Sequence, residues 1–286
     1  MLFGLNLLLF GDTVDREMLR TWFGRVKEIG FDGVEVPIFD AGSLNTDMIR
    51  GFAERYELQL TASGAMPKGA RFYGNDTSRR EVAERYLREG IRAASELGAP
   101  VFCGPFYKAL GDVGGHVPVE EQRARTADAL RPLAEFAWQE GVRLAIEPLN
   151  RFETDFLNTA LDGIGFVRAI GSPGAGLLLD TFHMHIEEKD SARAIESAGE
   201  ADALVHFHAS ENDRGMPGSG QVCWQEVSDA LEEADYDHWV VLETFNQENR
   251  AIRRAVSCWR PFYESEEAFM RDGLAFVKDQ FDPAQR

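Results

Sequence analysis

Short apolar runs alternate with longer amphipathic stretches along the whole chain. The runs are four to nine residues long and mostly continuous in hydrophobicity, which is typical of strands buried on both faces. They begin, in order, at Leu2, Gly33, Leu58, Pro100, Arg143, Gly176, Leu204 and His238. The first run, LFGLNLLLF, predicts one strand over 2–10.

Between these runs the apolar residues recur every three or four positions, which is the period of a helix with one buried face. The stretches after the second and sixth runs are shorter than the others. Pro132 lies inside the fourth helical stretch, where it predicts a kink or a break because proline lacks the amide hydrogen that a helix needs. Representative stripes are Leu19, Trp22, Phe23, Val26 and Ile29, and then Val82, Tyr86, Leu87, Ile91 and Ala94.

Eight strands and eight helical stretches in alternation predict an α/β fold, a single closed (β/α)₈ TIM barrel. An open dinucleotide-binding sheet would carry G-x-G-x-x-G after its first strand, and the stretch LLLFGDTVDRE offers only Gly11 there. The sequence contains no P-loop, low-complexity tract or linker that would divide it. We therefore expect one domain over residues 1–286.

Composition narrows the range of partners. Lys and Arg total 30 against 48 Asp and Glu, so the net charge is 30 − 48 = −18. A surface this acidic repels nucleic-acid phosphates and anionic lipids, so neither nucleic acid nor a membrane is an expected partner. The cysteines Cys103, Cys223 and Cys258 are single and odd in number, which favours a reducing compartment. The apolar start lacks the features of a signal peptide, and a cytoplasmic protein is expected.

Metal-binding residue types stand at the ends of the last four predicted strands. Glu147 ends the fifth, Asp180 the sixth, His208 the seventh and Glu243 the eighth. Their spacings of 33, 28 and 35 residues are each about one strand–helix unit. In a parallel barrel these ends lie side by side at the face that carries active sites.

Three carboxylates and an imidazole at one place would repel each other unless a cation held them together. Oxygen ligands with one nitrogen suit Mn²⁺, Mg²⁺ or Co²⁺, with Zn²⁺ as a further option. A single acid after a strand is more often the N-cap of the next helix. Four such residues on consecutive strands favour a site for one divalent metal over capping. The loops that follow add further candidates for contact with a substrate: Asn150, Arg151, Glu153, His183, Glu211, Arg214 and Phe245.

The strings IEPLNRFET, LLLDTFHMHIEE, HFHASENDR and VVLETF resemble the ketose 3-epimerases, the D-tagatose and D-psicose 3-epimerase group of the xylose-isomerase-like barrels. The similarity is strong over about 140–245 and mainly architectural before that. It implies that Glu147, Asp180, His208 and Glu243 bind the metal, usually Mn²⁺ or Co²⁺. Of the two histidines in HFH, the resemblance selects His208, because it precedes Arg214 by six residues and Glu243 by 35. It also implies substrate contacts for Glu153, His183 and Arg214, and a homodimer or homotetramer.

The chemistry implied is epimerisation of a free ketose at C3 through an enediolate, with the metal as Lewis acid. Two carboxylates are needed, one on each face of C3, and Glu147 and Glu243 are the candidates. His183 and Arg214 would polarise O2, Glu153 would orient a terminal hydroxyl, and Phe245 would line the pocket.

Several alternatives remain open. The same site could serve a sugar or keto-acid isomerase of the hydroxypyruvate or inosose type, or a relative that acts on 3-keto-glycosides. An endonuclease-IV-like repair enzyme is disfavoured by the charge of −18 and by only 6 His. A non-catalytic sugar-binding barrel is disfavoured by the intact pair of glutamates.

The first, third and fourth strand ends depart from the family pattern, so the wall around the distal carbons of the sugar is expected to differ. His116, after the fourth strand, is expected in a surface loop or a lid.

Overall fold

The computed structural model describes residues 1–113 and 117–281, so His116 lies outside the described residues. Its strands form one closed parallel barrel in sequence order, in which the first strand pairs with the eighth. The predicted barrel is therefore confirmed. The strands are β1 (Leu2–Asn6), β2 (Gly33–Pro37), β3 (Gln59–Ser63), β4 (Val101–Gly104), β5 (Arg143–Ile146), β6 (Ala175–Asp180), β7 (Leu204–Ala209) and β8 (Trp239–Leu242).

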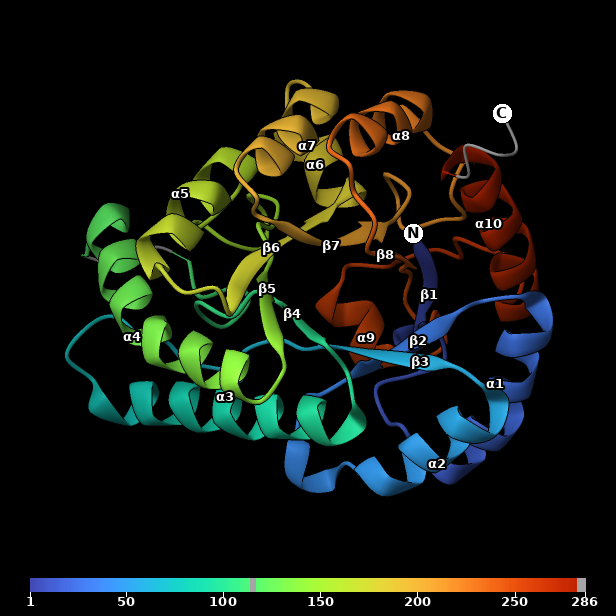
Figure 1. Ribbon diagram of the computed structural model, residues 1–286, viewed down its shortest axis with the longest axis horizontal. Helices are drawn as coiled ribbons and strands as arrows, with labels where there is room; N and C mark the ends of the chain where they lie inside the picture. The colour runs from blue at the N-terminus through green and yellow to red at the C-terminus, as the bar shows by residue number, and fades with distance from the viewer. Residues whose placement is uncertain (114–116, 282–286) are drawn as a thin grey trace.

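Helices form an outer ring around the strands (Figure 1). Two connections carry more than the single helix expected, since both α6 and α7 follow β6, and α9 and α10 follow β8. Within the described residues, no helix is both long and apolar enough to cross a membrane. The helices are α1 (Arg16–Ile29), α2 (Thr46–Tyr56), α3 (Thr77–Leu97), α4 (Val119–Gln139), α5 (Ala160–Ile170), α6 (Thr181–Glu187), α7 (Ser191–Glu200), α8 (Trp224–Glu233), α9 (Arg250–Ala255) and α10 (Glu266–Phe281).

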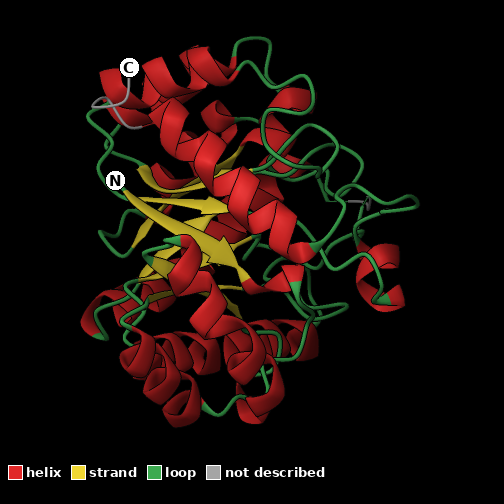
Figure 2. Ribbon diagram, turned by 90° about the vertical axis from the view of Figure 1, so that its right-hand side faces the viewer, coloured by secondary structure: helices red, strands yellow, loops and turns green. Residues whose placement is uncertain are grey.

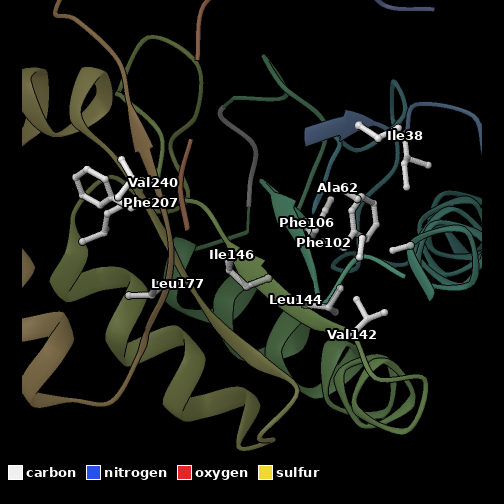
Figure 3. Packing of buried hydrophobic residues seen from close by; sticks show 14 of the residues in the cluster. Ile38, Ala62, Phe102, Phe106, Val142, Leu144, Ile146, Leu177, Phe207 and Val240 are labelled. Atoms are coloured by element: carbon white, nitrogen blue, oxygen red, sulfur yellow. The ribbon is translucent and has the colours of Figure 1, made fainter. Parts of the chain in front are cut away.

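Strand residues alternate between two apolar layers. In β4, Phe102 belongs to the large cluster between strands and helices, whereas Val101 and Cys103 belong to a small cluster inside the barrel. In β6, Leu178 likewise belongs to the inner cluster while its neighbours belong to the outer one. Figure 3 shows part of the outer layer, with Phe102 and Phe207 among its members. Because both faces of each strand are buried, the runs read as continuous rather than alternating.

The first strand is shorter than predicted. It ends at Asn6, and Leu7–Leu9 form a 3₁₀ turn, because the Asn6 side-chain oxygen accepts a hydrogen bond from the Leu8 amide at 2.9 Å. An asparagine that bonds its own backbone two residues on favours a turn over an extended strand. The predicted strand over 2–10 is therefore wrong after Asn6.

The fourth helix is not broken at Pro132. Helix α4 runs from Val119 to Gln139 with the proline inside it. Leu130 and Leu133 on either side are buried in the core, and their packing offsets the lost hydrogen bond.

The barrel floor is closed by an indole ring. Trp239 at the start of β8 is buried, and a methyl group added to Gly33 of β2 would lie 2.6 Å from its ring. Glycine is required there by the close approach of two strands and the ring. In Figure 2 the strand arrows point away from the N-terminus, towards the side where the long loops gather, so this is the face for a site.

Candidate active site

The four predicted ligand residues lie together at the C-terminal face of the barrel. Glu147 directly follows β5 and Glu243 directly follows β8, while Asp180 ends β6 and His208 lies within β7. All four side chains are buried. Together with His183 they form two overlapping groups in which the donor atoms lie within 4.8 Å of one another: Glu147, Asp180 and His183, and Asp180, His208 and Glu243.

Asp180 both caps a helix and faces the site. Its Oδ1 accepts a hydrogen bond from the Phe182 amide at 2.8 Å and so caps α6. Its Oδ2 accepts one from the Arg214 guanidinium at 2.6 Å. One carboxylate oxygen of Asp180 therefore caps the helix, and the other faces the predicted site.

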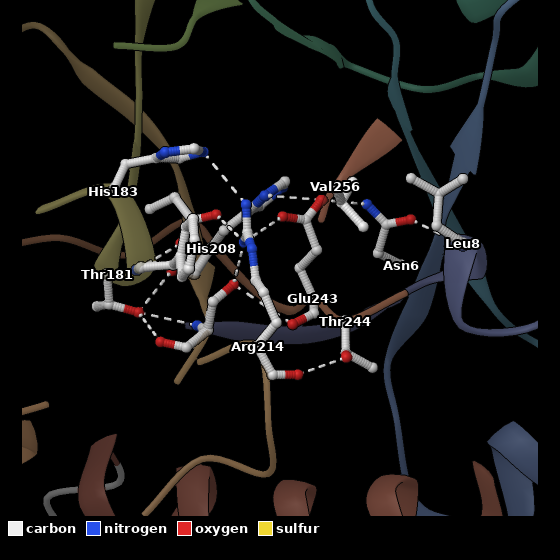
Figure 4. A network of polar contacts seen from close by, with 12 residues as sticks. Asn6, Leu8, Thr181, His183, His208, Arg214, Glu243, Thr244 and Val256 are labelled. Carbon is white, nitrogen blue, oxygen red and sulfur yellow. Dashed lines mark hydrogen bonds and ion pairs between the residues drawn. The ribbon is translucent and has the colours of Figure 1, made fainter. Parts of the chain in front are cut away.

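Arg214 is the cation at the centre of the buried acids. Its Nη1 donates to Asp180, to Glu243 Oε2 at 2.8 Å and to Ser210 Oγ at 2.9 Å, as Figure 4 shows in part. The guanidinium lies 4.0 Å from the centre of the Phe182 ring and 5.0 Å from that of Phe245. These planar contacts fix its position, which a flexible ammonium could not match.

The loop that carries Arg214 is organised by Glu211. This carboxylate is buried and accepts hydrogen bonds from four backbone amides and from the Trp224 indole. Arg214 itself adopts a left-handed conformation with φ of 65°, and its carbonyl accepts a hydrogen bond from Thr244 at 2.6 Å. Glu211 is thus committed to the loop, so the expectation that it reaches a substrate is wrong.

His183 is held as a neutral ring. Its Nδ1 accepts a hydrogen bond from the Asn150 amide at 3.0 Å, and its Nε2 lies 3.2 Å from Arg214 Nη2 and 3.5 Å from Glu147 Oε1. Burial and the nearby Arg214 lower the pKa of His183 to about 3. Its Nε2 thus lies between a guanidinium, which can only donate, and a carboxylate of the pocket.

The surroundings of Glu147 and Glu243 shift their pKa values in opposite directions. Burial and the charge of Glu243 raise the pKa of Glu147 well above its usual range. Burial also acts to raise the pKa of Glu243, but the charges of His208 and Arg214 outweigh it and hold that pKa at about 2. Two carboxylates whose pKa values are pushed apart are the usual mark of an acid and a base.

The donor set fits a divalent metal ion. His208 Nε2 lies 2.9 Å from Glu35 Oε1, whereas its Nδ1 is buried, has no hydrogen-bond partner and lies 3.5 Å from Glu243 Oε1. An unpartnered imidazole nitrogen that faces carboxylates matches the ligand type that metal centres use. The residues that could hold the ion are Glu147, Asp180, His208 and Glu243.

Three of these residues, Glu147, His208 and Glu243, line a cavity of about 390 Å³. One side is polar and includes Glu147, Glu153, His183, Arg214 and Glu243. The other side, which we call the apolar wall, comes from the turn after β1, the loops after β2 and β4, and α9. Its members are Leu8, Phe39, Leu110, Ile252 and Val256.

Two of the remaining predicted contacts line the same cavity. Glu153 accepts a hydrogen bond from Asn150 Nδ2 at 2.7 Å, and its backbone carbonyl accepts one from Gly111 at 3.0 Å. Burial raises the pKa of Glu153. Phe245 lies between the guanidinium of Arg214 and Leu8, which belongs to the same small cluster.

Comparison with known proteins assigns the family. A model of the xylose isomerase-like TIM barrels matches residues 23–276. A probable ketose 3-epimerase of Synechocystis sp. is 32% identical over 259 residues, which cover 91% of this chain and 90% of that protein. The D-psicose 3-epimerase of Enterocloster bolteae is 32% identical over 274 residues, with 92% and 90% covered. The chain belongs to the ketose 3-epimerase family.

A solved structure agrees with this assignment. The D-allulose 3-epimerase from Methylomonas sp. in complex with D-allulose matches with a TM-score of 0.92 and 27% identity, over 98% of this chain and 97% of that one. The resemblance inferred from the four sequence strings is thus confirmed. As a ketose 3-epimerase family member, the protein is an enzyme of the isomerase class.

The structure of this ketose 3-epimerase family member departs from the sequence analysis at several residues. Arg151 turns away from the cavity and pairs with Glu187 at 2.8 Å, so the expectation that it contacts a substrate is wrong. Glu35, His206 and Asn6 form a buried polar network directly behind His208, and sequence reasoning missed it as a unit. A signal was present, since Glu35 stands in the middle of the apolar run GVEVP.

Proposed function

We propose that this protein is a divalent-metal-dependent epimerase that inverts free ketoses of the D-tagatose, D-psicose or L-ribulose type at C3. One observation carries the proposal. Glu147 and Glu243 leave the barrel at β5 and β8, three strands apart, and both line one cavity. Epimerisation needs one proton carrier on each face of the carbon, and this placement supplies two. The names of the relatives support a ketose as the substrate class.

The metal centre is part of the proposal. Glu147, Asp180, His208 and Glu243 would hold one ion per chain, Mn²⁺ in preference to Co²⁺ or Mg²⁺, because three carboxylates and one imidazole suit these ions. When bound, the ion would supply Lewis-acid stabilisation of the charge that develops on the substrate oxygens.

Each residue that lines the cavity has its own role in this proposal. One of Glu147 and Glu243 removes the proton at C3, and the other returns a proton from the opposite face, so the carbon is inverted without net loss of hydrogen. His183 and the Arg214 guanidinium polarise O2, where negative charge develops. Glu153 accepts from a terminal hydroxyl and orients the sugar, and Phe245 packs against its carbon skeleton.

A proton-exchange screen tests the function. The Mn²⁺-loaded enzyme is incubated in D₂O with a panel of free ketoses, and the label at each carbon is followed by NMR after removal of the metal. Deuterium at C3 together with the C3 epimer is the expected result. Label at C1 with an aldose product would identify an isomerase instead, and the absence of exchange with every ketose would contradict the proposal.

Metal binding is expected to stabilise the fold. At an Mn²⁺ concentration of 100 times Kd, the free energy of unfolding of the metal-free protein should rise by about 2.7 kcal/mol. The His208→Gln variant should lose most of this gain, because it lacks the unpartnered Nδ1. Unfolding in urea with and without Mn²⁺ measures this gain in the wild type and in the variant. His238→Gln is the matched control, since His238 is exposed at the other end of the barrel; an equal loss in both variants would argue against His208 as a ligand.

We further propose that residues 1–286 act as one domain in a reducing cytoplasm and assemble as a homodimer or homotetramer. The three cysteines are free, which supports the compartment. Large apolar side chains left exposed, among them Phe152 and Trp259, support self-association. Light scattering coupled to size-exclusion chromatography distinguishes the two assemblies, and a monomer would contradict both.

A further inference from the structure

A fully buried carboxylate lies inside the barrel, directly behind the proposed metal ligands. Glu35 of β2 is 0% exposed, and its two oxygens are surrounded by hydrogen-bond donors. The donors are Asn6 Nδ2 at 3.0 Å, Thr61 Oγ1 at 3.1 Å, Cys103 Sγ at 3.4 Å, His206 Nε2 at 2.6 Å and His208 Nε2 at 2.9 Å. So many donors on two oxygens leave no room for a proton on Glu35, so the carboxylate is ionised.

This arrangement determines which nitrogen of His208 is available. A histidine binds a metal ion as a neutral imidazole, with a proton on one nitrogen and the lone pair of the other on the ion. Because Nε2 lies 2.9 Å from Glu35 Oε1 and donates to it, Nδ1 is the nitrogen left for an ion. That atom is buried without a partner and lies 3.5 Å from Glu243 Oε1, on the side of the cavity.

The same network also reaches Glu243. Asn6 Nδ2 donates to Glu35 Oε1 at 3.0 Å and to Glu243 Oε1 at 2.9 Å. Asn6 Oδ1 accepts a hydrogen bond from the Leu8 amide, so the orientation of the side-chain amide is determined. One asparagine therefore ties the carboxylate behind the site to a carboxylate inside it, as Figure 4 shows on the Glu243 side.

Stability alone does not explain a charge at this place. The neighbouring layer inside the barrel is apolar and contains Val101, Ala145, Leu178 and Val205. Burying an ionised carboxylate among such residues is costly, and apolar side chains of similar volume are usually at least as stable. Glu35 contacts one proposed metal ligand directly and another through Asn6. These contacts indicate that its charge has a functional role.

We propose that Glu35 is a positioning residue of the metal centre. It fixes His208 with Nδ1 towards the ion and, through Asn6, holds Glu243 Oε1 in place. A carboxylate behind a histidine ligand also increases the basicity of the imidazole and so strengthens its bond to a metal. The inference rests on the metal site of the proposed function and does not depend on which sugar is epimerised.

The Glu35→Gln variant tests the inference by metal affinity, without any substrate. Glutamine keeps the volume but offers one acceptor oxygen, so it cannot serve both histidines. We expect the Kd for Mn²⁺, measured by calorimetry on the metal-free protein, to rise about 10–100-fold. The absorption spectrum of the Co²⁺-loaded protein should also change, since the spectrum reports the ligand geometry. An unchanged Kd together with an unchanged Co²⁺ spectrum would overturn the inference.

Thr61→Val is the matched control. It removes one donor to Glu35 in the same buried layer but leaves both histidine contacts, so its Mn²⁺ affinity should stay close to that of the wild type. An equal loss of affinity in both variants would mean that general packing, and not the contact with His208, sets the affinity, and the inference would fail.

A measurement on the unmodified protein covers the case in which Glu35→Gln does not fold. In the Zn²⁺-loaded protein with ¹⁵N-labelled histidine, His208 should carry its proton on Nε2 and show Nδ1 as the ligand. A proton on Nδ1 would overturn the inference, as would two bound ions per chain, since Glu35, Cys103, His206 and His208 also lie close enough to hold an ion. Absence of any metal binding would overturn both this inference and the proposed metal dependence. Normal metal results without ketose exchange would contradict only the function.

Discussion

The Glu147→Gln variant is expected to lose epimerisation by about 10²–10⁴-fold in kcat, the range that a general acid–base group contributes. Glutamine keeps the size and an oxygen that can face the metal, but it cannot carry a proton to or from C3. Because the proposal gives each face of C3 its own carboxylate, one epimer should still exchange its C3 proton through Glu243 without being inverted. Exchange into D₂O, measured separately for the two epimers, detects this asymmetry.

Two controls make the result specific. Glu89→Gln on the exposed surface of α3 should retain full activity. The Glu147→Gln protein should still contain its metal by elemental analysis, which separates lost proton transfer from a lost ion. Epimerisation at the wild-type rate in either Glu147→Gln or Glu243→Gln would exclude the pair as the two proton carriers.

Replacing Arg214 by methionine is expected to have the largest effect on stability. The change leaves Asp180 and Glu243 buried without the cation that bridges them, and an unpaired buried charge costs about 3–5 kcal/mol. In the metal-loaded protein the loss should be smaller, because a divalent ion supplies positive charge at the same carboxylates. Unfolding in urea, for the metal-free and the metal-loaded protein, gives the loss of stability in each form.

The matched control is Arg260, which lies between α9 and α10 and pairs with the residue just before Arg214. Arg260 pairs with Asp213 at 2.9 Å, but its side chain is 67% exposed. The Arg260→Met variant should lose less than about 1 kcal/mol, as exposed ion pairs generally do. If Arg214→Met were as stable as this control, the buried acids would have to be neutral, and the electrostatic description of the site would be wrong.

The strand ends were predictable because barrel topology brings consecutive ends to one face. Once the runs were assigned, the spacing of Glu147, Asp180, His208 and Glu243 predicted their convergence without knowledge of any side-chain conformation. The limit of the first strand was not predictable from hydrophobicity, because Leu7–Leu9 are as apolar as the strand before them. The hydrogen bond of Asn6 ends the strand, and only the asparagine itself indicates that turn.

The hydrophobic pattern also could not predict the direction of side chains in the loops. Arg151 and Glu211 stand in the same loops as Glu153 and Arg214, yet each is engaged elsewhere, by Glu187 and by backbone amides respectively. Loop position restricts which residues can reach the cavity but does not determine which of them do. Glu35 is the opposite case, because Val34 and Val36 on either side pack in the outer cluster, and alternation along the strand then directs Glu35 into the barrel.

The apolar wall and the metal-binding acids come from different segments of the chain, and this separation bears on how the enzyme can change. Substitutions at Leu110 or Val256 alter the space for a substrate without touching Asp180 or His208. Effects at sites without shared partners usually add. Wall variants can therefore be screened for new substrates on an unchanged metal site. Within the wall, Leu8, Ile252 and Val256 pack in one cluster, so combinations among them will be non-additive. Phe245 belongs to the same cluster and also contacts Arg214, so its substitution will affect both sides of the cavity.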